Sequence, residues 1–185
     1  SNLPTLPQVA SRLLHLINDP STSAADVAQL VGQDISLSAK IIRLANSAYY
    51  GAPHEIASIQ SAVVRLGFKV INTMVLSLTV FDMFPSDKHS VHFDRAAFWR
   101  HCIRSALCAK LIARMLPRTR IDPEEAFCAG LLHDIGKIVM EQYLHEDFTR
   151  ALEKAVAVPT AYYTAEQTAL EYTHTDVAQW LTLRW

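Results

Sequence analysis

The residues best suited to chemistry in this sequence are His133 and Asp134, which stand side by side in the string A-G-L-L-H-D-I-G-K over 129–137. An adjacent histidine and aspartate in an apolar segment are costly to bury unless hydrogen bonds or a cation satisfy them. Imidazole nitrogen and carboxylate oxygen together suit a borderline or hard divalent metal. The pair therefore predicts either a metal site or a hydrogen-bonded pair in the core.

Two further polar features each have a functional and a local interpretation. Lys137 follows His133 by four residues, so it could neutralise a phosphate or be a solvated lysine at a helix end. In the first half of the chain, polar and aromatic residues gather around a predicted helix end: Lys40, Arg43, Asn46, Ser47, Tyr49 and Tyr50. They either satisfy the local backbone and pack between lobes, or line a groove, together with Lys137, for a partner protein or a small signal.

The elements that must position these residues are predicted to be helices. Only 5 of the 185 residues are glycine, and apolar residues recur at helical spacing along most of the chain. Side chains that can cap helix N-termini stand at Thr5, Ser23, Asp34, Ser58 and Thr173. The string Asp122-Pro123-Glu124-Glu125 predicts the start of the helix that carries the His–Asp pair.

A polar stretch without apolar periodicity divides the chain. We predict an N-terminal helical lobe over residues 1–85, a linker over 86–94 and a second helical lobe over 95–185. The helical pattern that begins after Thr173 is still running at Trp185. We therefore expect the second lobe to continue beyond this residue in the native protein.

The overall composition argues against several classes of protein. A formal net charge of -1 and a pI of about 6.7 give no basic field that would recruit nucleic acid or an anionic membrane. The longest apolar stretch, 70–84, contains polar residues and falls short of the roughly 20 apolar residues of a membrane span. No secretory leader is recognisable. The three cysteines form no C-x-x-C pair, so we expect reduced thiols in a cytoplasmic protein.

Longer strings of this sequence resemble the HDOD family of bacterial signalling modules. They are L-P-T-L-P-Q-V-A (3–10), Q-D-I-S-L-S-A-K-I-I-R-L-A-N-S-A-Y-Y-G (33–51), S-I-Q-S-A-V-V-R-L-G (58–67), F-W-R-H (98–101) and E-E-A-F-C-A-G-L-L-H-D-I-G-K (124–137). The last string also resembles the signature of the HD superfamily of metal-dependent phosphohydrolases. The resemblance implies an all-α, multi-helical fold with an N-terminal helical lobe packed on an HD-like C-terminal lobe.

The same resemblance implies a set of metal ligands. They would be His101, His133 and Asp134. His174 stands where related HD-GYP enzymes begin an H-x-x-x-G pattern, but the fifth position here is Ala178. This sequence also lacks the later His-His pair, the further aspartate and the G-Y-P string of those enzymes. We therefore expect a vestigial site and no cofactor, except for an adventitious divalent ion.

Three functions are compatible with the resemblance. The favoured one is a non-catalytic regulatory module that contacts signalling proteins, such as receiver or cyclic-di-GMP turnover domains. The second is a metal-dependent phosphohydrolase acting on a nucleotide or cyclic dinucleotide. The third is a sensor that binds a nucleotide without cleaving it. Neither a membrane nor nucleic acid is expected as a partner.

Overall fold

The computed structural model describes residues 4–17, 19, 21–51, 54–85, 93–116, 120–157 and 161–185. The elements of these ranges make the protein all-α, as the sequence predicts. The chain divides into two compact units, which we call the N-terminal unit (Leu6–Met83) and the C-terminal unit (Ser1–Thr5 with Phe84–Trp185). None of the helices in the described ranges combines the length and apolar character needed to cross a membrane.

The unit boundaries differ in part from the predicted lobes. Residues 1–5 go with the C-terminal unit instead of the N-terminal lobe over 1–85. One reason is a hydrogen bond from the Trp185 indole Nε1 to the Pro4 carbonyl, 3.2 Å long. Most of the predicted linker, residues 86–92, lies outside the described residues. Its last residue, Asp94, caps the following helix by accepting a hydrogen bond from the Ala97 amide.

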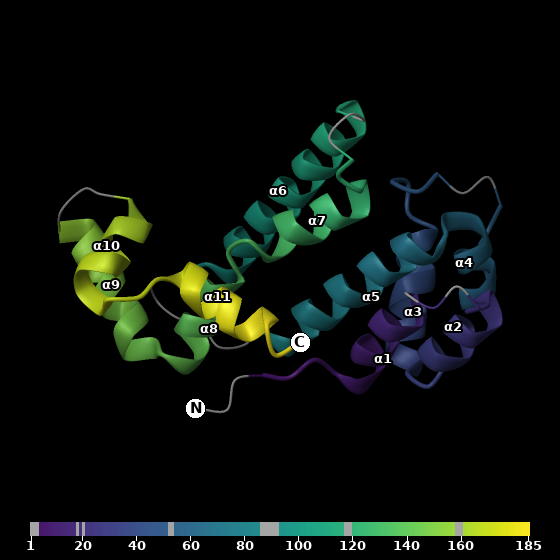
Figure 1. Ribbon diagram of the computed structural model, residues 1–185, viewed down its shortest axis with the longest axis horizontal. Coiled ribbons are helices and arrows are strands. Elements are labelled where there is room, and N and C mark those ends of the chain that lie inside the picture. Colours follow the sequence, from purple (N-terminus) through teal and green to yellow (C-terminus); the bar gives the residue numbers. More distant parts are fainter. Residues whose placement is uncertain are drawn as a thin grey trace. The chain divides into compact units, whose positions relative to one another are not determined.

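The N-terminal unit is a group of helices around one apolar helix (Figure 1). The helices are α1 (Gln8–Ile17), α2 (Ala24–Val31), α3 (Ile35–Ala45), α4 (Ile59–Leu66) and α5 (Phe68–Met83). α5 is apolar on most of its circumference and packs against α1, α3 and α4, so its side chains form the centre of the core. The predicted caps are confirmed at Ser23, Asp34 and Ser58, whereas α1 begins at Gln8, three residues after the predicted cap Thr5.

The C-terminal unit contains a long helical hairpin and a group of shorter helices (Figure 1). The helices are α6 (Arg95–Met115), α7 (Pro123–Leu132), α8 (Ile135–Tyr143), α9 (His145–Ala157), α10 (Tyr162–Leu170) and α11 (His174–Thr182). α6 packs against α7, α8 against α9 and α11, and α9 against α10. Thr173 and Asp176 form the capping box that the sequence predicts before α11.

Two buried ion pairs and one glycine fix the position of α6. Arg95, at its start, pairs with Glu141 on α8, and both side chains are 4% exposed. Lys110, near its other end, pairs with Glu124 of α7 at 2.6 Å. A Cβ on Gly130 would lie 2.7 Å from the Ala106 Cα, so only glycine lets α6 and α7 approach so closely. The hairpin therefore has a fixed register from end to end.

Candidate metal centre at the His–Asp turn

His133 and Asp134 lie in the turn between α7 and α8, not on a helix as the sequence predicted. Asp122 caps α7 as expected, accepting hydrogen bonds from the amides of Glu124 and Glu125, but α7 ends at Leu132. On a continuous helix, neighbouring side chains point about 100° apart. The turn lets the exposed His133 and the buried Asp134 face the same point.

A third side chain reaches this point from α6. His101 Nε2 lies 3.2 Å from His133 Nε2 and 3.5 Å from Asp134 Oδ2, and His133 Nε2 lies 3.4 Å from the same oxygen. Ligand atoms about 2.0–2.2 Å from a divalent metal are about 3–3.5 Å from one another. The geometry of His101, His133 and Asp134 thus fits a two-histidine, one-carboxylate metal site. It is the one such group within the described ranges.

A backbone contact sets the orientation of His133. Its Nδ1 lies 2.8 Å from the Gly130 carbonyl oxygen, which can only accept a hydrogen bond. Nδ1 therefore carries a proton, and Nε2 faces Asp134 and His101. Outer contacts of this kind orient histidine ligands in metal sites.

Lys137 lies against the same carboxylate oxygen that faces the two histidines. Its Nζ donates a hydrogen bond to Asp134 Oδ2 at 2.7 Å, and its side chain is 24% exposed. Burial by itself would raise the pKa of Asp134, but hydrogen bonds from His174 and Lys137 outweigh it and hold the pKa below its usual range. Lys137 is thus neither free to meet a phosphate nor a fully solvated helix-end lysine.

The other oxygen of Asp134 faces His174, at the start of α11. His174 Nε2 lies 3.3 Å from Asp134 Oδ1, and its Nδ1 lies 2.5 Å from Glu166 Oε2. Burial favours neutral His174, but the two carboxylates outweigh it and raise its pKa. Each nitrogen of His174 thus faces a carboxylate oxygen, and His174 lies beside the three-residue group but outside it.

Sequence reasoning missed Glu166 and the role of Gly136. Glu166 is fully buried on α10, and the signal for it was a carboxylate among the apolar residues of that helix. A Cβ on Gly136 would lie 1.8 Å from the His174 carbonyl oxygen. Gly136 therefore allows α8 to meet the first residue of α11, which brings His174 beside Asp134.

The polar residues of the proposed groove are divided between the two units. Lys40 pairs with Asp82 of α5 at 2.7 Å, and Tyr49 packs edge-on against Tyr50 with ring centroids 4.8 Å apart. Asn46 donates to the carbonyls of Ile42 and Ile56 and accepts from the Ile56 amide, which matches its local interpretation. Arg43 is exposed on α3. All of these lie in the N-terminal unit, whereas Lys137 belongs to the C-terminal unit.

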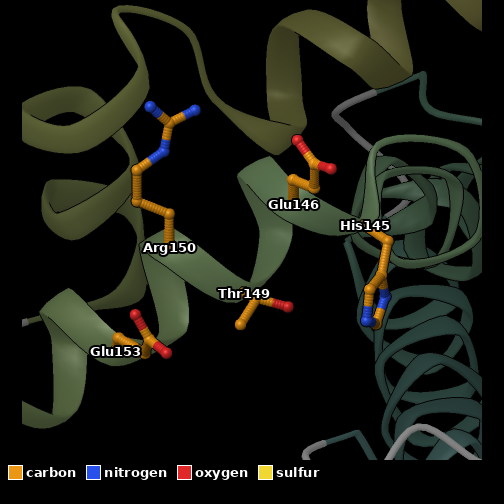
Figure 2. Close-up of a pocket in the computed structure, with 5 residues that line it drawn as sticks. All are labelled: His145, Glu146, Thr149, Arg150 and Glu153. Carbon is orange, nitrogen blue, oxygen red and sulfur yellow. The ribbon is translucent and has the colours of Figure 1, made fainter.

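An open hollow on α9 is a weaker candidate than the His–Asp turn (Figure 2). It is lined by His145, Glu146, Thr149, Arg150 and Glu153, all from one helix. Arg150, the one arginine or lysine among them, forms an ion pair with Asp147. Figure 2 shows the lining side chains spread along the helix and not converging on one point. The hollow therefore offers no set of groups that would hold a ligand.

Comparison with known proteins shows which family this chain resembles over nearly its whole length. The family model described as HDOD domain matches residues 3–185. A solved HDOD domain protein of unknown function from Geobacter sulfurreducens is 30% identical, with a TM-score of 0.85. A solved protein of Shewanella amazonensis, provisionally named a phosphohydrolase, is 31% identical, with a TM-score of 0.80. An uncharacterized protein of Treponema pallidum is 23% identical over 183 residues.

These relatives are longer than the present chain. The matches cover 100% of this chain and 61% of the Geobacter protein, and 99% of this chain and 63% of the Shewanella protein. In the Treponema protein, the match covers 97% of this chain and 35% of the relative. The similarity thus extends over nearly the whole of this chain but over only part of each relative.

Proposed function

This chain belongs to the HDOD domain family, and we propose that it is a non-catalytic regulatory module whose His–Asp turn is a vestigial metal centre. In this proposal the module acts by binding signalling proteins, such as receiver or cyclic-di-GMP turnover domains, and not by turning over a substrate. The turn then serves to hold α6, α8 and α11 together.

The observation that carries the proposal is the contact between Lys137 and Asp134. The ammonium lies 2.7 Å from Oδ2, the one carboxylate oxygen that also faces His101 and His133. A fixed positive charge at this oxygen repels a divalent ion and reduces the negative charge that would hold it. His174 and Glu166, which pair with each other, add no further ligand to the group. The site is therefore built around an internal cation.

A second candidate is a metal-dependent phosphohydrolase, and the separations of 3.2–3.5 Å among the three ligand atoms favour it. A divalent ion held by His101, His133 and Asp134 would supply an activated water for hydrolysis. In that case Lys137 would have to leave Asp134 and could contact a phosphate. The two candidates differ in whether the ammonium or a metal ion neutralises Asp134.

Replacement of Lys137 tests which cation belongs at this carboxylate. Lys137→Met keeps most of the apolar stem and removes the charge, so we expect it to bind Mn²⁺ at least about tenfold more tightly than the native protein in calorimetric titrations. Lys154→Met, an exposed lysine on α9, is the matched control and should leave the affinity unchanged. Equal Mn²⁺ affinity in native protein and Lys137→Met would contradict the role assigned to Lys137.

Turnover tests the non-catalytic assignment directly. We expect no hydrolysis of phosphodiesters or nucleotides by the native protein with Mn²⁺, Mg²⁺, Fe²⁺ or Zn²⁺. Metal-dependent hydrolysis that disappears in His133→Ala and persists in His145→Ala would overturn the proposal. His145 is a suitable control because it is exposed and lies on α9, outside the group of three ligands.

A further inference from the structure

The α6–α7 hairpin extends well beyond the His–Asp turn. At one end of the hairpin, His101 Nε2 lies 3.2 Å from His133 Nε2. Further along, Lys110 Nζ lies 2.6 Å from Glu124 Oε1, so the two helices remain paired there. α6 then continues to Met115 while the chain returns through Ile121 into α7. The hairpin therefore presents a long surface that begins at the candidate metal centre.

One face of α6 along this hairpin is exposed. Each of its residues lies three or four positions from at least one other, so all of them share one side of the helix: His101, Arg104, Cys108, Leu111, Ile112 and Met115. The part far from the turn is apolar, with Leu111 57%, Ile112 56% and Met115 79% exposed. Ile121, which precedes α7, is 55% exposed. We call the surface formed by these residues the hairpin face.

The charge around the hairpin face is basic, although the whole chain has a net charge of -1. Arg104 lies on the face, Arg114 and Arg120 are exposed near its apolar end, and the exposed acid on this part of α7 is Glu125. Large aliphatic side chains within a basic border match a helix that has an apolar stripe and acidic flanks. The residues that define the face include no Trp or Tyr, the usual membrane-interface anchors. Nucleic-acid interfaces, in contrast, are largely polar.

We propose that the hairpin face docks an amphipathic helix of a partner protein, with acidic residues on both sides of an aliphatic stripe. The stripe would cover Leu111, Ile112 and Met115, and an acidic flank would meet Arg104. The opposite end of the docked helix would then lie near His101 and His133. The inference rests on the proposed role as a binding module and specifies the chemistry of its partner.

A synthetic helix tests the proposal with the full chain. The probe is an 18-residue peptide with leucines at helical spacing and glutamates on both flanks, and its binding is followed by a fluorophore attached to the exposed Cys108. Two control peptides keep the composition but scramble the leucine stripe, or keep the stripe but replace glutamate by lysine. We expect the first peptide to bind, and both control peptides to bind at least about tenfold more weakly.

Surface variants locate the binding site. The double variant Ile112→Gln with Met115→Gln, and separately Arg104→Glu, should each weaken binding by about tenfold or more. Matched controls are Val156→Gln on α9, which is 81% exposed, and Arg65→Glu on α4, and they should leave binding unchanged. Because all these side chains are exposed, circular dichroism should show the same fold in every variant.

Several outcomes would overturn the proposal. They are no binding of the acidic peptide, equal binding of the control peptides, or slow labelling of Cys108, which would show that the face is already covered. Sedimentation that shows a dimer dissociated by the double variant would assign the face to a second copy. Binding to vesicles containing anionic lipid, lost in the same variant, would assign it to a membrane. A docking failure without hydrolysis refutes only this inference, whereas hydrolysis refutes the proposed function.

Discussion

The polar residues that follow α3 and those that follow α7 have different kinds of partner. At the end of α3, Asn46 bonds the backbone of Ile42 and Ile56, so its polar atoms complete the local fold. At the end of α7, Asp134 is met by ionisable side chains from α6, α8 and α11. The first arrangement satisfies backbone groups and leaves nothing to react. The second concentrates charge at one carboxylate, an arrangement that is frequent at functional sites and also occurs in structural ion-pair networks.

The largest expected effect comes from closing the space that lets α8 meet α11. Gly136→Ala would place a Cβ 1.8 Å from the His174 carbonyl, so we expect the free energy of unfolding to fall by about 3 kcal/mol or more. Gly51→Ala is the counterpart after α3, where the φ of 55° disfavours a side chain but no atom is nearby. It should cost only about 1 kcal/mol in urea unfolding. Similar costs for both would show that α8 and α11 are not held tightly together.

Removal of the central carboxylate should have the next largest effect. Asp134→Ala leaves Lys137 and His174 without their shared partner, which should reduce the free energy of unfolding by about 1–3 kcal/mol. If Lys137 supplies the cation, EDTA should change the thermal unfolding of the native protein little. A large EDTA effect on the native protein that is absent in Asp134→Ala would show an intact metal centre. The proposed vestigial character would then be wrong.

Features that depend on neighbours in sequence were predictable, and those that depend on packing between helices were not. The caps at Ser23, Asp34 and Asp122 were correctly predicted because each cap and its partners lie within four residues. The break at His133 and Asp134, between α7 and α8, was missed, because the close contact of Gly136 with α11 that accompanies it cannot be seen in the sequence.

The contacts between side chains of different helices were the part of the site that residue spacing could not predict. Glu166 meets His174 only because α10 and α11 fold against the turn, and its place among the apolar residues of α10 does not by itself name this partner. His101 was identified by family resemblance, since it lies 32 positions before His133 and this distance matches no local ligand spacing. Lys110, which is 2% exposed, shows the same limit: a lysine is expected at the surface until Glu124 is known to face it.

Substitution of Asn46, which bonds the backbone at the end of α3, should reduce the free energy of unfolding less than Asp134→Ala does. This loss should not depend on metal. Asn46→Ala removes three hydrogen bonds and leaves the amide and carbonyl of the buried Ile56 to find water, so we expect a loss of about 1 kcal/mol or slightly more. Asn46→Asp keeps the acceptor for the Ile56 amide and should recover part of the loss. An EDTA-dependent change in either variant would contradict a purely local role for Asn46.

The smallest expected effect concerns Asp147, a carboxylate that has side-chain partners but lies outside the His–Asp turn. Asp147 on α9 accepts a hydrogen bond from Tyr172, which is the main reason that its pKa lies below the usual value, with Arg150 adding to the effect. Because the pKa is lower in the folded protein, this stabilisation is present above the unfolded pKa of about 3.9 and is lost as the pH falls through the folded value. Tyr172→Phe should therefore cost about 0.5–1 kcal/mol at pH 7 and less at pH 3, as measured by urea unfolding.

Tyr163→Phe is the control, since Tyr163 bonds the neutral Gln167 and its substitution should have the same effect at both pH values. A cost for Tyr172→Phe that does not change with pH would mean that the bond does not depend on the charge of Asp147, and the contrast between Asp134 and an ordinary paired carboxylate would become sharper.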